Sequence, residues 1–270
     1  MKLPEFTLVH RGGPPTAKAR VKATRGVGAG RPTGASPAEL AKEALPAVAS
    51  GAQRVGIWDL GAYVGRLPQV IEAVNRAQNE LAFFEALAAM PAGTVSQPER
   101  VRAWARELGG PRRMPGLEAN VIAEDFYRRA EKVRRDLGID YLAGVTAKLI
   151  ADEDDDQVYY NLFAAATKRL ILVSSYDLRK YAAKAGRPFE AAVVGLVVAE
   201  VLALRNRRLE FHSENRGCLF DYNEDRASIV KVLKDPRIED SCLQKIAPAQ
   251  RTAAVALVEA LRRYPEGGRS

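Results

Sequence analysis

Three side chains able to bind a metal or transfer a proton follow one another between positions 200 and 218. Glu200 is the only charged residue in the apolar run from Ala191 to Leu204, and His212 and Cys218 come soon after it. Carboxylate, imidazole and thiol groups are the usual protein ligands of zinc, and carboxylates and imidazoles are common general bases. The spacing therefore predicts a site close to the end of a buried helix.

Glu200 has two interpretations. A helix that is apolar almost all round lies in a protein core, and a carboxylate within it must be protonated, paired or turned to a cleft. One hypothesis makes Glu200 the remnant of a general base. The other, which we favour, makes it a core or cleft carboxylate paired with an arginine.

The residues after the helix have several interpretations. Cys242 adds a second thiol to His212 and Cys218, and Glu239 or Asp240 offers a carboxylate, so that these residue types suit a residual structural zinc site. The two thiols can instead be reduced, buried and packed as small hydrophobic groups. A Cys218–Cys242 disulfide is disfavoured inside a cell, and a Cys218–His212 nucleophile pair is a further alternative.

Positive charge is concentrated at the N-terminus. Of the net charge of +8, the first 35 residues carry +6, because they hold seven Lys or Arg and one acidic residue. About +2 remains for the rest of the chain. The Gly- and Pro-rich composition of residues 1–36 predicts a loosely attached basic arm. The alternative is contact with nucleic acid through residues 1–35, without stacking on bases, because the basic part has no interleaved aromatics.

Cysteine content and hydropathy indicate the compartment. Two cysteines do not make a disulfide framework. The N-terminus has no secretory apolar segment, and no apolar run reaches the length of a membrane span. We therefore expect a cytoplasmic protein with no membrane partner.

Strands and helices alternate along the part of the chain that must position these residues. The pattern predicts helices over 36–49, 67–89, 99–108, 124–137, 187–204, 226–233 and 248–263, and strands over 54–60 and 168–174. Residues 140–150 are expected to form a strand, either alone or with a turn of helix. Residues 158–167 form a short apolar-aromatic segment. The acidic run 152–156 is expected in a solvated loop, with a calcium site as the alternative. This order predicts the α/β (α+β) class, with one domain over 37–265 after the arm.

Residues 140–246 contain, in order, the segments AGVTAKL, YYNLFAAA, RLILVSS, the apolar helix, HSENRGCLF and IEDSCLQKI. This order resembles that of the archaemetzincins, a zincin-fold family of metallopeptidases, in which strands are followed by an HExxHxxGxxH helix and then by cysteines. The resemblance implies a mixed sheet, a backing helix at 67–89 and a buried active-site helix. It also implies a substrate cleft beside an edge strand at 168–174.

The chain departs from the family pattern at the metal ligands. If Glu200 is aligned with the family's general base, Ala199 and Ala203 replace both helical histidines. If His212 is aligned with the last histidine instead, a leucine and an asparagine replace them, and Cys218 matches a zinc-binding cysteine. Either alignment removes the helical ligands of a catalytic zinc.

The number of histidines limits the chemistry further. The chain has only His10 and His212, so a three-histidine zinc site cannot be built within one chain. We therefore expect a zincin-like scaffold without peptidase activity, which holds a protein or peptide partner in its vestigial cleft by strand addition. The alternatives are an active hydrolase with an atypical site, built from Glu200, His212, Cys218 or the acidic run, and a nucleic-acid-associated protein.

Overall fold

The computed structural model describes residues 51–108, 116–154 and 157–265. A five-stranded sheet lies at its centre, in the order β2–β1–β4–β8–β7. The first four of these strands are parallel, and β7 runs antiparallel to β8. The strands are β1 (Gln53–Asp59), β2 (Leu81–Glu85), β4 (Tyr141–Thr146), β7 (Ala164–Thr167) and β8 (Leu170–Ser174). The predicted mixed sheet and α/β class are confirmed.

A second, smaller sheet has the order β3–β5–β6. It is formed by β3 (Asn120–Ile122), β5 (Leu149–Asp154) and β6 (Gln157–Leu162). The prediction of a solvated loop over 152–156 was wrong for its first three residues, which lie in β5. The reason is that β5 and β6 pair as a hairpin, with Asp152 opposite Tyr159, so cross-strand pairing holds an acidic segment extended.

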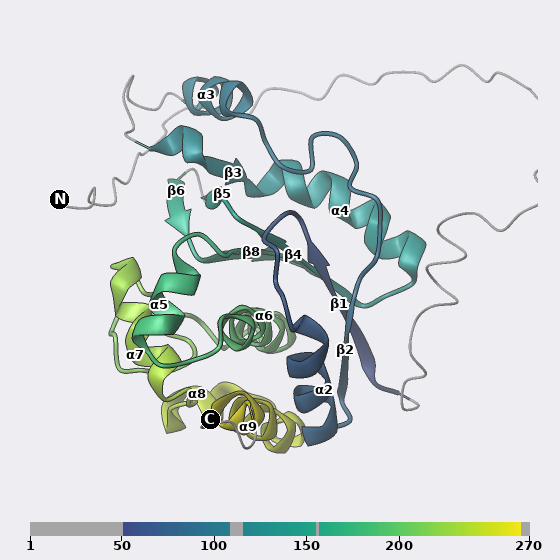
Figure 1. Ribbon diagram of the computed structural model, residues 1–270, viewed down its shortest axis with the longest axis vertical. Coiled ribbons are helices and arrows are strands. Elements are labelled where there is room, and N and C mark those ends of the chain that lie inside the picture. Colours follow the sequence, from purple (N-terminus) through teal and green to yellow (C-terminus); the bar gives the residue numbers. More distant parts are fainter. Residues whose placement is uncertain (1–50, 109–115, 155–156, 266–270) are drawn as a thin grey trace, which may run out of the picture.

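Helices cover both faces of the central sheet (Figure 1). On one face lie α2 (Leu67–Ala77), α5 (Leu178–Lys184), α6 (Phe189–Arg205), α7 (Ile229–Lys234) and α9 (Pro248–Arg263). On the other face lies α4 (Ala123–Leu137), and α3 (Pro98–Glu107) packs against the smaller sheet. The remaining elements are η1 (Leu117–Ala119), η2 (Arg226–Ser228) and α8 (Asp240–Lys245).

The two faces of the sheet are filled by alternate residues of the same strands. In β8, Leu172 packs with α4, whereas Ile171 and Val173 join the core that contains α6. Alternation with period two is what a strand buried on both faces must show. The helix α6 thus rests on one side of a sheet that is itself fully covered.

The buried helix predicted over 187–204 is confirmed as α6. Thirteen of its seventeen residues are buried, including Glu200. Arg205 ends the helix and forms an ion pair of 2.9 Å with Glu80. The apolar stretch is therefore a core helix, as its length and composition predicted.

The long helix predicted over 67–89 was wrong, because the segment forms α2 and then the strand β2. Gln78 follows the helix in an extended conformation, and its side-chain oxygen accepts hydrogen bonds from the backbone N–H groups of Glu80 and Leu81. The backing helix is therefore eleven residues long.

The strand over 168–174 is confirmed as β8, but its expected place at the sheet edge was wrong. β8 lies between β4 and β7, and β7 is the edge strand. The apolar-aromatic segment 158–167 forms β6 and β7, and a hairpin from β7 to β8 covers the side that we expected to be open.

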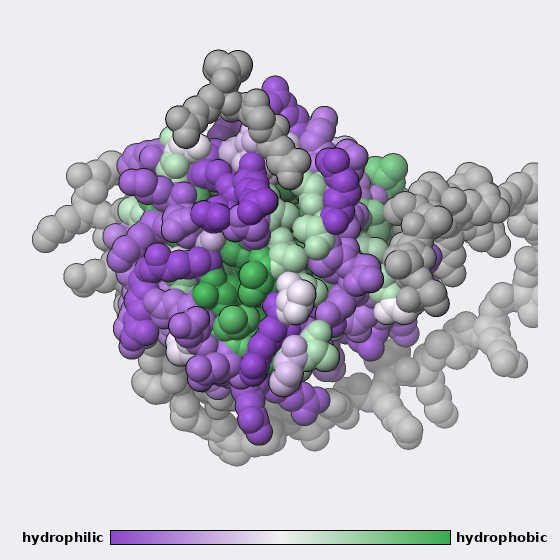
Figure 2. All heavy atoms as spheres, turned by 90° about the horizontal axis from the view of Figure 1, so that it is seen from below, coloured by the Kyte–Doolittle hydropathy of each residue, from purple (hydrophilic) through white to green (hydrophobic). Residues whose placement is uncertain are grey.

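The other helix predictions inside the described residues are confirmed, with small shifts of their ends, as α3, α4, η2 with α7, and α9. The pattern did not predict α5 and α8. The helix expected over 36–49 and the basic arm lie outside the described residues. Within those residues, no helix combines the length and apolar character that a membrane span requires. The face over α9 is mostly hydrophilic, with one compact hydrophobic group (Figure 2).

Candidate functional site

A cavity of about 440 Å³ lies beside the edge strand β7. Its walls come from β6 and β7, from one face of α6, and from the segment 211–236. Three consecutive residues of β7, Ala164, Ala165 and Ala166, line it. Successive side chains of a strand point to opposite faces, so three in a row indicate that the edge of β7 borders the cavity. We call this cavity the β7–α6 cleft.

The face of α6 toward the cleft is made of small and apolar residues with one exception. Ala191, Ala192, Gly195 and Leu196 line the cleft, followed one turn later by Glu200. These positions recur at helical spacing on one face. Glu200 is therefore the only ionisable group that α6 offers to the cleft.

The Glu200 carboxyl is buried without a partner. The residue is 9 % exposed, and no hydrogen bond or ion pair within the described part of the chain reaches its side chain. The expected arginine partner is absent there, because the nearest cation along the helix, Arg205, binds Glu80 instead. Burial raises the pKa of Glu200 from its usual 4.5 to about 8, so the carboxyl is mostly protonated at neutral pH.

Other polar groups line the cleft, but no histidine or lysine of the described residues does. Asp152 lies on its wall and accepts a hydrogen bond of 3.4 Å from the Tyr127 hydroxyl. Arg187 donates to the backbone carbonyls of Leu261 and Tyr264. The Arg187 guanidinium is therefore hydrogen-bonded to the backbone. The described lining is mostly apolar, and its carboxyl groups outnumber its cations.

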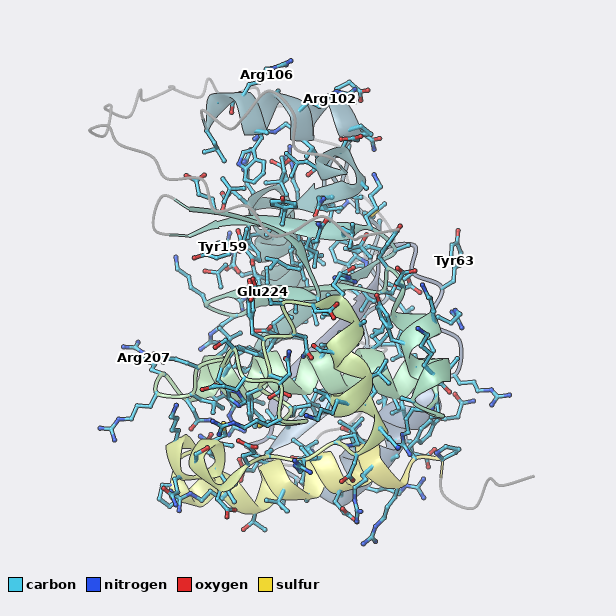
Figure 3. All side chains as sticks on the ribbon, turned by 90° about the vertical axis from the view of Figure 1, so that its left-hand side faces the viewer. Tyr63, Arg102, Arg106, Tyr159, Arg207 and Glu224 are labelled. Carbon is cyan, nitrogen blue, oxygen red and sulfur yellow. The ribbon has the colours of Figure 1, made fainter. Side chains whose placement is uncertain are left out.

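Two tyrosines line one side of the cleft, and the acidic residue Glu224 lies near one of them. Burial, followed by the nearby Tyr159 and Glu224, raises the pKa of Tyr222 to about 12. Tyr159 and Tyr222 both line the cleft, and Tyr222 is 38 % exposed. Figure 3 views this side of the molecule, with Tyr159 and Glu224 at mid-height between α3 and α9.

A buried arginine fastens the segment 211–236 to the sheet. Arg226 donates to the carbonyls of Asn161, at 2.7 Å, and Tyr176, at 2.8 Å. Its guanidinium lies 3.7 Å from the centre of the Phe163 ring. Burial lowers the pKa of Arg226 to about 10. These contacts hold one wall of the cleft against β6 and β7.

The three residues predicted for a zinc site lie together. The ligand atoms of His212, Cys218 and Cys242 are all within 4.8 Å of one another. Backbone bridges bring them there, since His212 pairs with Asp221 and Cys218 pairs with Arg237, just before α8. Glu239 and Asp240, which we had considered as further ligands, are not members of this group.

The surroundings of His212 suit a metal ligand. Its Nδ1 lies 3.1 Å from the carbonyl of Glu214 and 3.5 Å from an Asp221 carboxylate oxygen. Its Nε2 is buried with no hydrogen-bond partner. A proton on Nδ1, held by the Glu214 carbonyl, leaves the Nε2 lone pair available, which is how histidine ligands are usually oriented.

The two cysteines are free and almost completely buried. The backbone N–H of Glu239 donates to Cys218 Sγ at 3.5 Å, a contact that also stabilises a thiolate ligand. Burial raises the pKa of Cys218 to about 11, so the thiol is neutral unless a cation displaces its proton. None of the three residues lines the β7–α6 cleft, so the cluster lies behind the wall of the cleft.

The donor set fits zinc in type and approximately in distance. Tetrahedral zinc with bonds of 2.0–2.3 Å places its ligand atoms roughly 3.3–3.8 Å apart, and the three ligand atoms here lie within 4.8 Å of one another. Three protein ligands leave the fourth position to a ligand from outside the protein.

The structure brings the predicted residues to two places rather than one. Glu200 lies in the cleft, whereas His212, Cys218 and Cys242 form the cluster behind it. No sequence pattern pointed to Arg187 or Tyr222 as cleft residues, whereas Asp152 belongs to the acidic run that was a candidate for an atypical site. Only the apolar-aromatic composition of residues 158–167 pointed to the wall that β6 and β7 form.

No family model and no curated relative matches this chain. Among solved structures, the chain is similar to an archaemetzincin from Methanopyrus kandleri, with 14% identity over 79% of this chain and 98% of that one, and a TM-score of 0.47. It is also similar to a zinc-dependent peptidase from Methanocorpusculum labreanum, with 17% identity over 72% of this chain and 100% of that one, and a TM-score of 0.40. These values are too low to assign an activity.

Proposed function

We propose that this protein is a binding module that holds an extended peptide in the β7–α6 cleft without hydrolysing it. The observation that carries the proposal is the cleft itself, bordered by the open edge of β7 and walled by α6. An edge strand offers backbone N–H and C=O groups to a further strand. The apolar wall gives side chains of that strand a place to be buried.

The face of α6 that lines the cleft has too few donor groups to bind a catalytic zinc ion. A catalytic zinc needs about three protein ligands, and the helix face supplies alanine, glycine, leucine and a single glutamate. In residues 51–108, 116–154 and 157–265, the one group of donors close enough for a metal excludes Glu200. The cleft therefore lacks the means to activate water through a metal.

We further propose that His212, Cys218 and Cys242 hold a structural zinc ion. The support is the convergence of their ligand atoms and the orphaned Nε2 of His212. Zinc bound there would cross-link the segment that carries Phe211 and Leu219, both in the cleft wall, to α8. Its role would be to fix that wall.

The alternative of a hydrolase with an atypical site has less support. A Cys218–His212 nucleophile pair needs an accessible thiolate, whereas Cys218 is fully buried and its pKa is raised. Nucleic-acid binding through residues 1–35, like cytoplasmic location, stays a prediction. Deleting those residues should abolish salt-sensitive nucleic-acid binding if the arm is its cause.

A glycine in the cleft wall provides the test of the proposed function. A Cβ on Gly195 would meet only Leu261, at 3.9 Å, so Gly195→Leu fills the cleft without a clash at Cβ. Gly65→Leu is the control, because Gly65 is exposed and has nothing nearby. Each full-length protein is incubated with a mixture of random heptapeptides, and retained peptides are identified by mass.

We expect the unmodified protein and Gly65→Leu to retain intact peptides, and Gly195→Leu to retain few. Cleavage that requires zinc and disappears in Glu200→Gln would contradict the proposal and favour the hydrolase. Equal retention by Gly195→Leu would show that peptides bind elsewhere.

A further inference from the structure

Two carboxyl groups of the β7–α6 cleft have oxygen atoms without a hydrogen-bond partner in the described residues. One is Asp221, whose Oδ1 has no such partner, although its Oδ2 accepts from the backbone N–H of Gly217. The other is Glu200, which lines the cleft, is 9 % exposed and has no hydrogen-bond or ion-pair partner in the described residues. A buried carboxyl without a partner costs stability. Such a group facing a cavity therefore indicates what a ligand has to supply.

The other charged and titratable groups that line the cleft favour a cation. They are Asp152 from β5, Tyr159 from β6, Arg187 before α6, and Asp221 and Tyr222 after it. Burial, followed by the charges of Asp152 and Glu200, raises the pKa of Tyr127, which comes from α4. Arg187 is bound to two carbonyls, and Asp221 accepts from the backbone N–H of Gly217. Among the described residues, no lysine or histidine lines the cleft to neutralise Glu200.

The apolar walls restrict the kind of cation. Ala191, Ala192 and Gly195 lie on the same helix face as Glu200, and their small side chains leave a passage along α6. A narrow unbranched aliphatic stem can be buried there while a compact ammonium group reaches the carboxyl.

We propose that the β7–α6 cleft selects a primary ammonium group on an unbranched aliphatic stem, with Glu200 as its counter-ion. In a peptide held along β7, this group is the side chain of lysine, so the assignment to lysine rests on the proposed function. The ammonium pocket itself does not depend on peptide binding.

Binding of an ammonium is coupled to the ionisation of Glu200. Burial keeps the carboxyl mostly protonated near neutral pH, whereas the counter-ion of an ammonium is the carboxylate. Binding therefore releases a proton from Glu200. Below the pKa of about 8, the affinity should rise by about tenfold per pH unit, and it should level off above that pH.

The test compares three peptides that differ at one position. The probes are acetyl-Thr-Val-Thr-X-Thr-Val-Thr-amide, with X as lysine, norleucine or acetyl-lysine. Norleucine keeps the aliphatic stem and lacks the ammonium. Titration calorimetry on the full chain, in buffers of different protonation enthalpy, gives both the affinity and the number of protons released.

We expect the lysine peptide to bind more than about tenfold more tightly than the other two, with close to one proton released at pH 7. In Glu200→Gln, that preference and the proton release should both disappear, while binding of the norleucine peptide is kept. Binding of norleucine as tight as that of lysine would overturn the proposal.

Two small molecules separate this inference from the proposed function. If n-hexylamine binds in a Glu200-dependent way and n-hexanol does not, the ammonium pocket stands, even if no peptide binds and the proposed function falls. If peptides bind but show no preference for lysine, the ammonium pocket falls and the proposed function stands. If neither the peptides nor n-hexylamine bind, both proposals fall.

Discussion

At the scale of single residues, Glu200 should make the protein less stable as the pH rises. Its pKa is about 8 in the folded state, against a usual 4.5, so the folded state binds the proton more tightly than the unfolded state does. The stabilising effect is complete below pH 4.5 and is lost as the pH rises through about 8. The loss is about 3–5 kcal/mol.

Urea unfolding of the wild-type protein and of Glu200→Gln between pH 5 and 9 measures this effect. We expect the free energy of unfolding of Glu200→Gln to rise relative to the wild type across that range. A constant difference between the two proteins would mean that Glu200 ionises normally in the folded state.

The partners of the site residues could not be predicted from their types. His212, Cys218 and Cys242 lie together, as a zinc site would require. Glu200 is buried as the apolar helix predicted, but it has no arginine partner in the described residues. An apolar helix indicates burial, whereas the partner of a side chain depends on contacts between segments that are distant in sequence. Arg205 illustrates this, because its partner is Glu80.

At the scale of elements, period and composition predicted α6, α9 and β8 because each has one unambiguous pattern. They failed for residues 67–89, where apolar spacing suits a helix and the segment Leu81–Glu85 also suits a strand. Parallel pairing with β1 makes Leu81–Glu85 a strand instead of a continuation of the helix. The edge position of β7 was hidden for the same reason, since strand order depends on pairing between distant segments.

Asn75 joins α2 to the outer strand β2. Its side-chain amide donates to the carbonyl of Phe83 at 2.8 Å and accepts from the N–H of Phe83 at 2.9 Å. Asn75→Ala leaves both backbone groups without these bonds, so we expect a loss of about 1–3 kcal/mol in the free energy of unfolding. Gln69→Ala, at an exposed position of the same helix, is the control.

Chemical denaturation of the two variants tests this role. Asn75→Ala as stable as Gln69→Ala would show that the Asn75 amide does not help to hold β2.

At the scale of the whole molecule, two cores enclose the sheet, and the cleft opens at the β7 edge, at the opposite end of the sheet from the β2 edge. The His212–Cys218–Cys242 cluster lies behind that cleft and links its wall to α8. The sequence indicated the composition of both places. The cleft and the cluster are separated because backbone bridges join His212 to Asp221 and Cys218 to Arg237. No local sequence pattern predicts these bridges.

Zinc should stabilise the whole fold through that cluster. The purified full chain should contain about one zinc ion, and a chelator should lower Tm by at least about 5 °C. Cys242→Ser should remove both the metal and the response to the chelator. Glu239→Gln is the control, because the Glu239 carboxylate binds Arg216 at 3.2 Å instead of joining the cluster. Zinc-free protein with an unchanged Tm would exclude a structural metal.

Amide hydrogen exchange in β7 tests the central claim most directly. Exchange in the full chain is measured without peptide and with a heptapeptide that the protein retained in the random-heptapeptide assay. The peptide is then recovered and its mass is measured. The account predicts slower exchange in residues Ala164–Thr167 and a peptide of unchanged mass, because an added strand covers the edge of β7. Unchanged exchange in β7 under saturating peptide, or recovery of peptide fragments, would contradict it.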